Sequence, residues 1–363
     1  MKTKIALALA MIGLSSIALA GGPGNAMVVP TGTPVIAPDS TGTWSFGLEA
    51  LYMESNTNFQ YASVFDGVND DGEFQFDNES ASNTWNWGGE ADISYVFPGS
   101  SRDISASYTY LNQDNNDSVD ADEIGDPAIS AGILHVPAAG IVIVPPTSFT
   151  TVITGASADV DQTLNAATLT FGQLLTVGSR VTLHPFGGIQ FADIDTDNRA
   201  DYDGTLTSVT DIDGVIVTDA DPFDTTYKNS SDFVGAGPRA GIDASVHFGN
   251  FSIVGTFAAA LLVGNMDSEF EGATSIDGVT LATETENDSY TAVVPELDAK
   301  LGLDYMYAFN PNMSMNVQVG YEVVNYFNAE SNDALDSEFV NSVDNTSDFN
   351  YNGPYLRLQL NVA

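Results

Sequence analysis

Ionisable side chains recur at alternate positions in several apolar segments of the sequence. In one segment of the C-terminal third, one set of alternate positions is apolar and the other carries Glu296, Asp298, Lys300 and Asp304. Arg357 holds a position of the same kind near the C-terminus. Because successive residues of a β-strand point to opposite faces, these segments are predicted to be strands with one apolar and one ionic face. An enclosed ionic face can conduct ions or lock strands together by ion pairs.

Ionisable groups are costly against lipid, so those within membrane-crossing strands are expected to face an enclosed interior. By this rule the candidate lumen-lining and selectivity residues are Glu49, Glu90, Asp92, Arg239, Asp243, Glu296, Asp298, Lys300, Asp304, Glu322 and Arg357. Three of these residues are bases and eight are acids, which favours cations inside. The bases could equally serve to neutralise neighbouring carboxylates and fix the strand register. Locking and conduction both remain open, and both can hold at once.

Metal binding and catalysis find little support in the residue pattern. The three histidines lie in different segments and none has a partner at metal-ligand spacing. The nearest match to a calcium-binding EF-hand loop begins at Asp120 but has Ile124 and Ala131 where the motif needs oxygen ligands. The sequence has no cysteine and no nucleophile-elbow motif. We therefore predict no cofactor, no dedicated metal site and no enzymatic activity, with adventitious divalent-ion binding left possible at aspartate clusters such as 195–203.

The charge balance excludes partners that are themselves polyanions. The chain has 363 residues, with 9 Lys and Arg against 49 Asp and Glu, and a formal net charge of −40. A nucleic-acid partner requires a basic surface, so none is expected. Apolar residues make up 43% of the chain, enough for a folded protein, whereas charged residues make up only 16%. Ordinary soluble domains have roughly 25% charged residues.

The N-terminal residues have the pattern of a secretory signal. Lys2 and Lys4 precede a short apolar stretch that ends in Ala18-Leu19-Ala20. Residues 1–20 are therefore predicted to be a signal peptide, and the Gly- and Pro-rich residues 21–42 a flexible periplasmic leader. No later segment has 18 uninterrupted apolar residues. An exported bacterial chain of this kind is periplasmic, extracellular or an outer-membrane β-barrel.

Ten segments from residue 43 onward alternate between apolar and polar residues. We predict strands near 43–54, 84–97, 102–112, 163–177, 181–193, 232–248, 251–265, 291–309, 312–327 and 349–362. Each has ten or more residues, which is long for a soluble sheet and sufficient for a tilted strand to cross a bilayer. Short connections built from turn-forming residues alternate with long ones. This alternation is expected of an up-and-down barrel with short periplasmic turns and long outer loops.

The long connections are predicted to be acidic outer loops. They are approximately 55–83, 113–160, 195–230, 267–290 and 328–348, and they contain 35 of the 49 acidic residues. The acids either solvate the surface or also attract cations to the mouth of the barrel. The apolar stretch 129–147 is unusual for an exposed loop. It could constrict or plug the interior, or form a further hairpin that raises the strand count to twelve.

Several stretches resemble a known family. They are FVGAGPRAGIDA (233–244), VVPELDAKLGLDY (293–305), GYEVVNYFNA (320–329) and GPYLRLQL (353–360), with a thinner match at GLEALY (47–52). Together they are similar to the Legionella-type major outer membrane protein family, a resemblance that implies an outer-membrane barrel and pore formation. The resemblance supplies no catalytic residue and no substrate. The absence of cysteine departs from it and excludes disulfide-linked assembly.

The combined prediction is an all-β protein whose residues 43–363 form a closed, antiparallel, up-and-down transmembrane barrel of about ten strands. Its predicted place is the bacterial outer membrane, and its predicted function is passive diffusion of ions and small hydrophilic solutes with a modest preference for cations. Expected partners are outer-membrane lipid, lipopolysaccharide, small solutes and cations, with a homo-oligomer possible. The alternative is a non-conducting surface protein, an adhesin or structural anchor that presents acidic loops.

Overall fold

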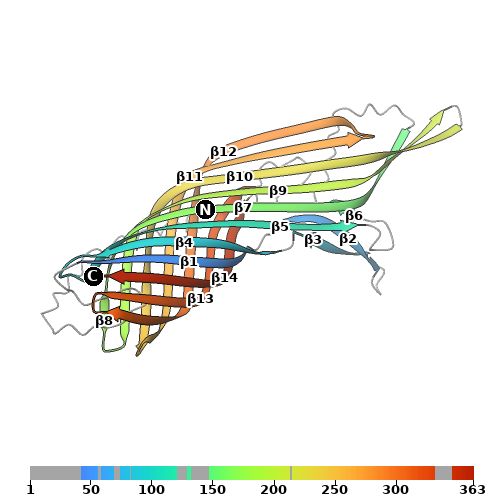
Figure 1. Ribbon diagram of the computed structural model, residues 1–363. Helices are drawn as coiled ribbons and strands as arrows, with labels where there is room; N and C mark the ends of the chain where they lie inside the picture. Colours follow the sequence, from blue (N-terminus) through green and yellow to red (C-terminus); the bar gives the residue numbers. More distant parts are fainter. Residues whose placement is uncertain are drawn as a thin grey trace.

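The structure is a computed structural model whose described residues are almost entirely β-strand (Figure 1). It describes residues 42–55, 59–68, 74–81, 83–120, 129–131, 147–212, 215–331 and 346–363. The predicted signal peptide, the leader up to residue 41 and most of the apolar stretch 129–147 lie outside the described residues. In the described part of the chain, no helix is long and apolar enough to cross a membrane.

Fourteen strands are present among the described residues, and the ten predicted strands are all among them. The ten are β1 (Thr43–Ser55), β4 (Trp85–Val96), β5 (Arg102–Asp120), β7 (Thr147–Gln173), β9 (Val181–Ile212), β10 (Val215–Phe248), β11 (Phe251–Ile276), β12 (Val279–Asn310), β13 (Met313–Ser331) and β14 (Thr346–Val362). The other four are β2 (Gln60–Val68), β3 (Phe74–Ser80), β6 (Ile129–Ala131) and β8 (Leu175–Val177). These four are short. β6 pairs with β7 and β8 with β9, while β2 pairs with β6 and β3 pairs with β2.

The ten long strands form a closed antiparallel ring. Hydrogen-bonded neighbours run β7-β5-β4-β1-β14-β13-β12-β11-β10-β9, and β9 pairs again with β7. The closing pair is extensive, since it runs from Thr147 opposite Thr210 to Gly172 opposite Phe186. Closure satisfies the backbone groups that an open sheet would leave unpaired at its edges. The prediction of about ten antiparallel strands is confirmed, whereas most of the stretch 129–147 that could add a further hairpin lies outside the described residues.

The short connections lie where the sequence predicted them, at one end of the ring. Turns occupy Pro98–Gly99, 178–180, Gly249–Asn250 and Pro311–Asn312. Gly99 and Gly249 have φ values of +65° and +73°, a left-handed conformation that a side chain disfavours. The turn-forming residues therefore set the register of each hairpin at this end.

The predicted long loops 195–230 and 267–290 are wrong as loops, because both are continuous β-hairpins. β9 and β10 stay paired up to Ile212 opposite Val215, and β11 and β12 up to Ile276 opposite Val279. These extensions are rich in Thr, Ser and Asp on the outward face, so they lack the apolar alternation by which the strands were predicted. Figure 1 shows β9 to β12 reaching well beyond the ends of β1 and β14.

The outward face of the ring carries a broad apolar belt. Leu48 and Leu301 expose 67% and 66% of their surface, and alternate residues along every long strand behave in the same way. Aromatic side chains lie at both margins of the belt, with Tyr52 beside Trp87 on one side and Phe251 beside Tyr305 on the other. From Trp44 to Tyr52 a strand rises about 26 Å at about 3.3 Å per residue. Because barrel strands are tilted, the band is somewhat lower than this rise, and an apolar band with aromatic margins is typical of membrane barrels.

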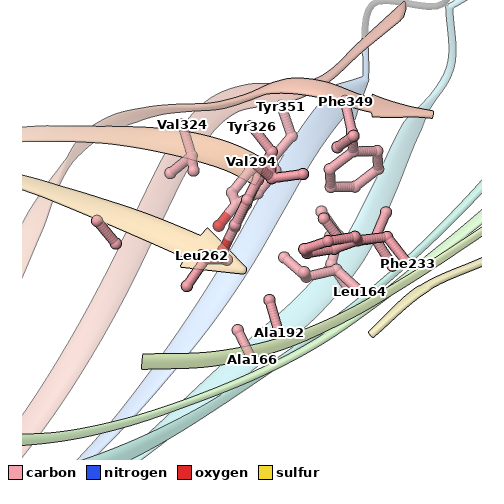
Figure 2. Close-up of a cluster of buried hydrophobic side chains, with 14 of the residues drawn as sticks. Leu164, Ala166, Ala192, Phe233, Leu262, Val294, Val324, Tyr326, Phe349 and Tyr351 are labelled. Atoms are coloured by element: carbon pink, nitrogen blue, oxygen red, sulfur yellow. The ribbon is translucent and has the colours of Figure 1, made fainter. Parts of the chain in front are cut away.

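The interior of the ring is layered, which the sequence analysis did not anticipate. Nearest the short turns lies a polar layer, then a layer of ion pairs, and directly above the ion pairs an apolar layer centred on Leu51, Leu164, Phe233, Leu262 and Phe349. Each of these five side chains is 0% exposed. Figure 2 shows how residues from opposite walls meet in this layer. A second apolar cluster that includes Ile153, Ala200 and Tyr202 lies further out, between the extended hairpins.

Several inward-facing glycines lie directly beneath aromatic side chains. The Tyr355 side chain lies over Gly302 and Gly320, with its hydroxyl 2.6 Å from the position that a Cβ would take at either glycine. Phe233 covers Gly235 in the same manner. The glycines therefore make room for aromatic rings that fill the ring's interior.

We predict that Gly320→Ala lowers the free energy of unfolding by about 1–3 kcal/mol, the usual cost of overpacking. The added Cβ would lie 2.3 Å from the Leu301 carbonyl oxygen, a contact that the backbone must move to relieve. Urea unfolding in lipid vesicles, followed by tryptophan fluorescence, measures the effect. Gly89→Ala is the control, because its Cβ would meet nothing closer than 3.4 Å. Equal losses in the two variants would contradict the tight packing at Gly320.

Candidate functional site

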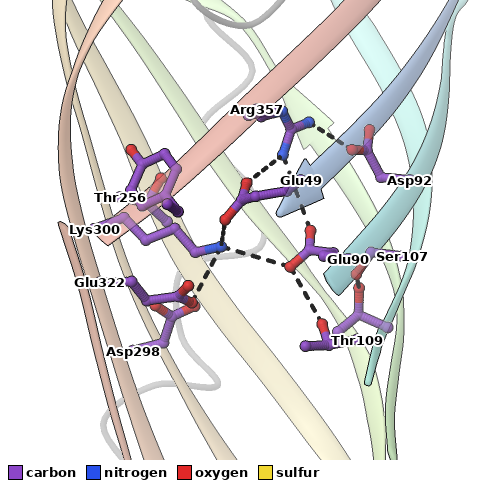
Figure 3. Close-up of polar contacts among 12 residues, drawn as sticks. Glu49, Glu90, Asp92, Ser107, Thr109, Thr256, Asp298, Lys300, Glu322 and Arg357 are labelled. Atoms are coloured by element: carbon purple, nitrogen blue, oxygen red, sulfur yellow. Dashed lines mark hydrogen bonds and ion pairs between the residues drawn. The ribbon is translucent and has the colours of Figure 1, made fainter. Parts of the chain in front are cut away.

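The centre of the ion-pair layer is Lys300 on β12. Its Nζ lies 3.0 Å from Glu49 Oε1, 3.1 Å from Glu322 Oε1 and 3.5 Å from Glu90 Oε2. These carboxylates come from β1, β13 and β4, so a single lysine joins strands that are far apart in the chain. Its side chain is 12% exposed. Figure 3 shows the ammonium group surrounded by the three carboxylates.

Arg357 on β14 extends the same network on the other side of Glu49. Its Nη2 lies 2.7 Å from Asp92 Oδ1, and its Nη1 lies 3.5 Å from Glu49 Oε2. Glu49 thus contacts both cations, one through each carboxylate oxygen. The strand register brings these residues side by side. Glu49 on β1 is directly opposite Arg357 on the neighbouring strand β14 and directly opposite Glu90 on the other neighbour, β4.

A second group of ion pairs is built on Arg239 of β10. Its Nη1 donates to Glu296 Oε1 at 2.8 Å and to Gln190 Oε1 at 2.8 Å, and its Nη2 donates to Asp298 Oδ2 at 2.6 Å. Gln190 in turn donates to the Tyr326 hydroxyl at 3.0 Å. This group therefore ties β9, β10, β12 and β13 together across the interior.

The two remaining predicted residues lie apart from these networks. Asp304 is buried near the short turns, where both of its carboxylate oxygens accept hydrogen bonds from Asn316. Asp243 Oδ2 lies 2.9 Å from Nδ1 of His184, whose Nε2 lies 2.8 Å from Asp103 Oδ1. Asp103 and His184 were missed in the sequence analysis. The alternation of inward and outward residues along β5 and β9 could have identified them. Asp103 precedes the outward residue Ile104, and His184 lies between the outward residues Leu183 and Pro185.

Ten of the eleven predicted residues line one cavity of about 260 Å³, and Asp304 is the exception. The cavity begins near the turn residues Ser100 and Ser101 and ends beneath the apolar layer at Val324 and Tyr351. Hydroxyl groups of serine and threonine form much of its remaining wall. Among the described residues, no group of three or more His, Asp or Glu side chains is arranged to hold a metal ion. The arrangement suits reversible contact with water and small polar solutes.

The acids in the two ion-pair networks outnumber the bases. Six carboxylates, those of Glu49, Glu90, Asp92, Glu296, Asp298 and Glu322, face three cations, Arg239, Lys300 and Arg357. Coulomb interactions are strong in such a buried setting, and each of the three cations contacts at least two carboxylates. The ion pairs also cross-link six strands, so the locking role has a structural basis.

Further acids form an outward band just above the apolar belt. Asp195 on β9 is opposite Asp232 on β10, and Asp232 is opposite Asp267 on β11. Partial burial raises the pKa of Asp195, and the charges of Asp197 and Asp193 raise it further. The pKa of Asp232 is raised by the same causes, burial first and then its aspartate neighbours. Like charges directly opposite one another destabilise a strand pair.

The sequence was compared with known families and proteins. Residues 36–362 match the family described as Legionella pneumophila major outer membrane protein precursor. The chain belongs to the Legionella major outer membrane protein family. Family membership places the protein in the bacterial outer membrane and, with the closed ring and its apolar belt, establishes an outer-membrane β-barrel. None of the curated proteins compared with the sequence matches it.

Solved structures share the strand architecture at low similarity. The outer membrane protease OmpT from Escherichia coli is 13% identical with a TM-score of 0.37, over 90% of this chain and 97% of that chain. The Pseudomonas putida toluene transporter TodX is 8% identical with a TM-score of 0.24, over 88% of this chain and 89% of that chain. Similarities this low do not indicate what this protein does.

We predict that Arg357→Met lowers the free energy of unfolding by about 3–5 kcal/mol, because it leaves buried carboxylates without their cation. Glu49 and Asp92 would lose their contacts with the guanidinium group. Urea titration of the protein in lipid vesicles measures the loss. Arg180→Met, at an exposed turn position, is the control and should change stability by less than about 0.5 kcal/mol. A similarly small effect of Arg357→Met would show that the network does not hold the strands together.

We predict that Asp232→Asn stabilises the protein at neutral pH by at most about 1 kcal/mol, by removing a like-charge contact. A carboxyl whose pKa is raised on folding favours the folded state when protonated, so its destabilising effect appears as the pH rises above the ordinary value of 3.8. The advantage of the variant should therefore vanish as the pH falls towards that value. Melting temperatures of both proteins across this pH range test the sign. A benefit that persists in full at the acidic end would contradict it.

Proposed function

We propose that the protein is a narrow outer-membrane pore for ions and small hydrophilic solutes, with a preference for cations. The observation that carries the proposal is the closed ten-stranded ring around a polar cavity whose wall has more acids than bases. An enclosed excess of negative charge raises the local concentration of cations and lowers that of anions. Family membership agrees with a role in the outer membrane. Lipid, lipopolysaccharide and small cations are the proposed partners, and no catalytic role is proposed.

The described conformation corresponds to a closed state of this pore. The apolar layer at Leu51 and Phe233 leaves those side chains with no exposed surface, and water does not pass readily through so tight an apolar constriction. Conduction therefore requires this layer and the ion pairs beneath it to rearrange. Because Lys300 has three alternative carboxylate partners, its ammonium group can move between them without losing all its ion pairs.

The last residues of β13, Ala329 to Ser331, form a strap across the interior above the apolar layer. The pairing of β13 with β14 shifts between Tyr326 and Glu330, and the strap's three residues are all buried. Glu330 Oε1 accepts hydrogen bonds from Gln162 at 2.5 Å and from Thr196 at 3.1 Å. These partners lie on β7 and β9, on the far side of the ring from β13. The strap therefore links opposite walls and is the proposed latch of the closed state.

A non-conducting surface protein is the second candidate, and the apolar layer is the observation that favours it. If the layer never opens, the ring serves as an anchor that presents the extended acidic hairpins β9–β10 and β11–β12 outside the cell. Planar-bilayer recording separates the two functions. Stepwise cation-preferring currents support the pore, whereas a silent membrane at high protein loading, or a preference for anions, overturns it.

We predict that Glu330→Ala raises the fraction of time that the pore is open by about tenfold. The variant removes a buried acceptor of three hydrogen bonds, from Gln162, Thr196 and Ser347. A hydrogen bond to a charged group contributes roughly 1.5–3 kcal/mol. Single-channel recording measures the open fraction directly. Glu269→Ala is the matched control, since it removes the same charge from an exposed outward position on β11. An unchanged open fraction in Glu330→Ala would show that the strap is not the latch.

A further inference from the structure

We propose that the ion-pair layer contains a binding site for small solutes that carry a primary ammonium group, formed by Glu296, Asp298 and Glu322. The inference rests on the proposed function, because it names the class of cation that the pore would take up in preference to others. The site lies within the cavity on the inner faces of β12 and β13. It is distinct from the ion pairs themselves, whose contacts use only one oxygen of each of these carboxylates.

Each of the three carboxylates has one oxygen that remains free. Within the described residues, Glu296 Oε2, Asp298 Oδ1 and Glu322 Oε2 are buried and accept no hydrogen bond. The opposite oxygens contact Arg239 or Lys300. The side chains are only 2%, 8% and 5% exposed, respectively. A buried polar atom without a partner is costly, and the cost is greater when the group is charged. Three such atoms in one wall therefore indicate a ligand with hydrogen-bond donors.

The strand register brings the three carboxylates together. Glu296 and Asp298 are alternate residues of β12, so both face inward from the same strand. Lys300 is opposite Glu322, and Asp298 is opposite Val324. Asp298 and Glu322 are consequently diagonal neighbours across the β12–β13 pair, and Figure 3 shows their carboxylates below the Lys300 ammonium group. Glu296 lies one inward position further along β12, opposite Tyr326, and shares the Arg239 guanidinium group with Asp298.

The carboxylates around the site outnumber the bases, which leaves room for one more cation. The six carboxylates of the two networks share three bases, so the bases do not pair with every carboxylate oxygen in this buried setting. Buried charges of this kind are stable only when they are paired. A cation from solution would supply the missing positive charge while leaving the existing ion pairs in place.

The donor count and the available space point to a primary ammonium group. An ammonium group has three N–H donors and no acceptor, which matches three free carboxylate oxygens. Charge-assisted N–H···O bonds of about 2.7–2.9 Å are roughly twice as strong as neutral ones. The cavity of about 260 Å³ also leaves room for the organic part of the solute. Hydroxyl groups such as that of Thr256 lie on the cavity wall for further polar contact.

The test compares two isomeric cations, tert-butylammonium and tetramethylammonium. They have the same charge, composition and nearly the same shape, but only tert-butylammonium has N–H donors. Titration calorimetry of the full-length protein in detergent micelles at neutral pH measures the affinity for each, and melting temperatures give a second readout. We expect saturable binding of tert-butylammonium with a concentration-dependent rise in melting temperature, and at least tenfold weaker binding of tetramethylammonium.

Variants locate the site. Glu322→Gln should weaken tert-butylammonium binding about tenfold, because the amide replaces a charged acceptor with a neutral one. Asp304→Asn is the matched control, since Asp304 is an inward carboxylate of the same strand whose oxygens are both occupied by Asn316. Its affinity should equal that of the unmodified protein. The comparison of the two isomers on unmodified protein remains decisive if Glu322→Gln fails to fold.

Several results would overturn the inference. Equal binding of the two isomers would show that only charge is recognised, and tighter competing binding of Mg²⁺ would assign the oxygens to a metal ion. Absence of binding between pH 6 and 9 would indicate that the free oxygens hold protons or water instead. Bilayer currents distinguish these failures from failure of the proposed function. A protein that conducts but does not bind the amine refutes the site alone, and one that binds but never conducts refutes the pore alone.

Discussion

Hydrogen bonding between β7 and β9 closes the strand ring, and the arrangement of every other group depends on this closure. An open ten-stranded sheet would expose two rows of backbone donors and acceptors, which lipid cannot satisfy. Once the ring is closed, each strand has one face towards lipid and one towards an interior of fixed width. Alternate residues are thereby committed to opposite environments. The apolar belt, the buried ion pairs and the cavity are consequences of that single geometric constraint.

The interior shows how ionisable groups are tolerated inside the membrane. Lys300, Arg239 and Arg357 each contact at least two carboxylates, so these three inward bases all have partners. Because these ion pairs join distant strands, they restrain the ring while retaining an excess of acid. The residues that lock the strands together are therefore the same residues on which the proposed cation preference rests. The apolar layer directly above the network separates this charged region from the outer side of the membrane.

Closure of the interior involves two different kinds of interaction. The apolar layer excludes water through tight packing of side chains from opposite walls, whereas the strap at Glu330 relies on hydrogen bonds to neutral partners on β7 and β9. Hydrogen bonds can be exchanged for bonds to water when the strap moves, whereas the apolar layer can open only if its packed side chains separate. The proposed pore thus has a rigid frame, a charged centre and a latch whose release does not require the ring to open.

The sequence alone determined the outer surface and the strand order of this protein. Alternation in stretches such as Trp44 to Tyr52 reflects a local rule, because a strand's side chains alternate regardless of what surrounds it. The same parity placed Glu49, Arg239 and Lys300 on the inner face. Turn-forming residues such as Gly249 and Asn250 likewise fixed the short connections locally. The polar hairpin extensions escaped prediction, since strands that face water on the outside have no apolar alternation to reveal them.

Only the tertiary structure decided which inward residues meet. Contacts such as Glu49 with Lys300 or Glu330 with Gln162 depend on ring closure and strand register, and these residues lie 251 and 168 positions apart in the chain. The same is true of Tyr355, whose ring fills the space above Gly302 and Gly320. His184 became part of a carboxylate cluster because β5 and β10 approach β9 from opposite directions around the ring. Such packing is set by the diameter of the closed ring, a property that no single segment of sequence carries.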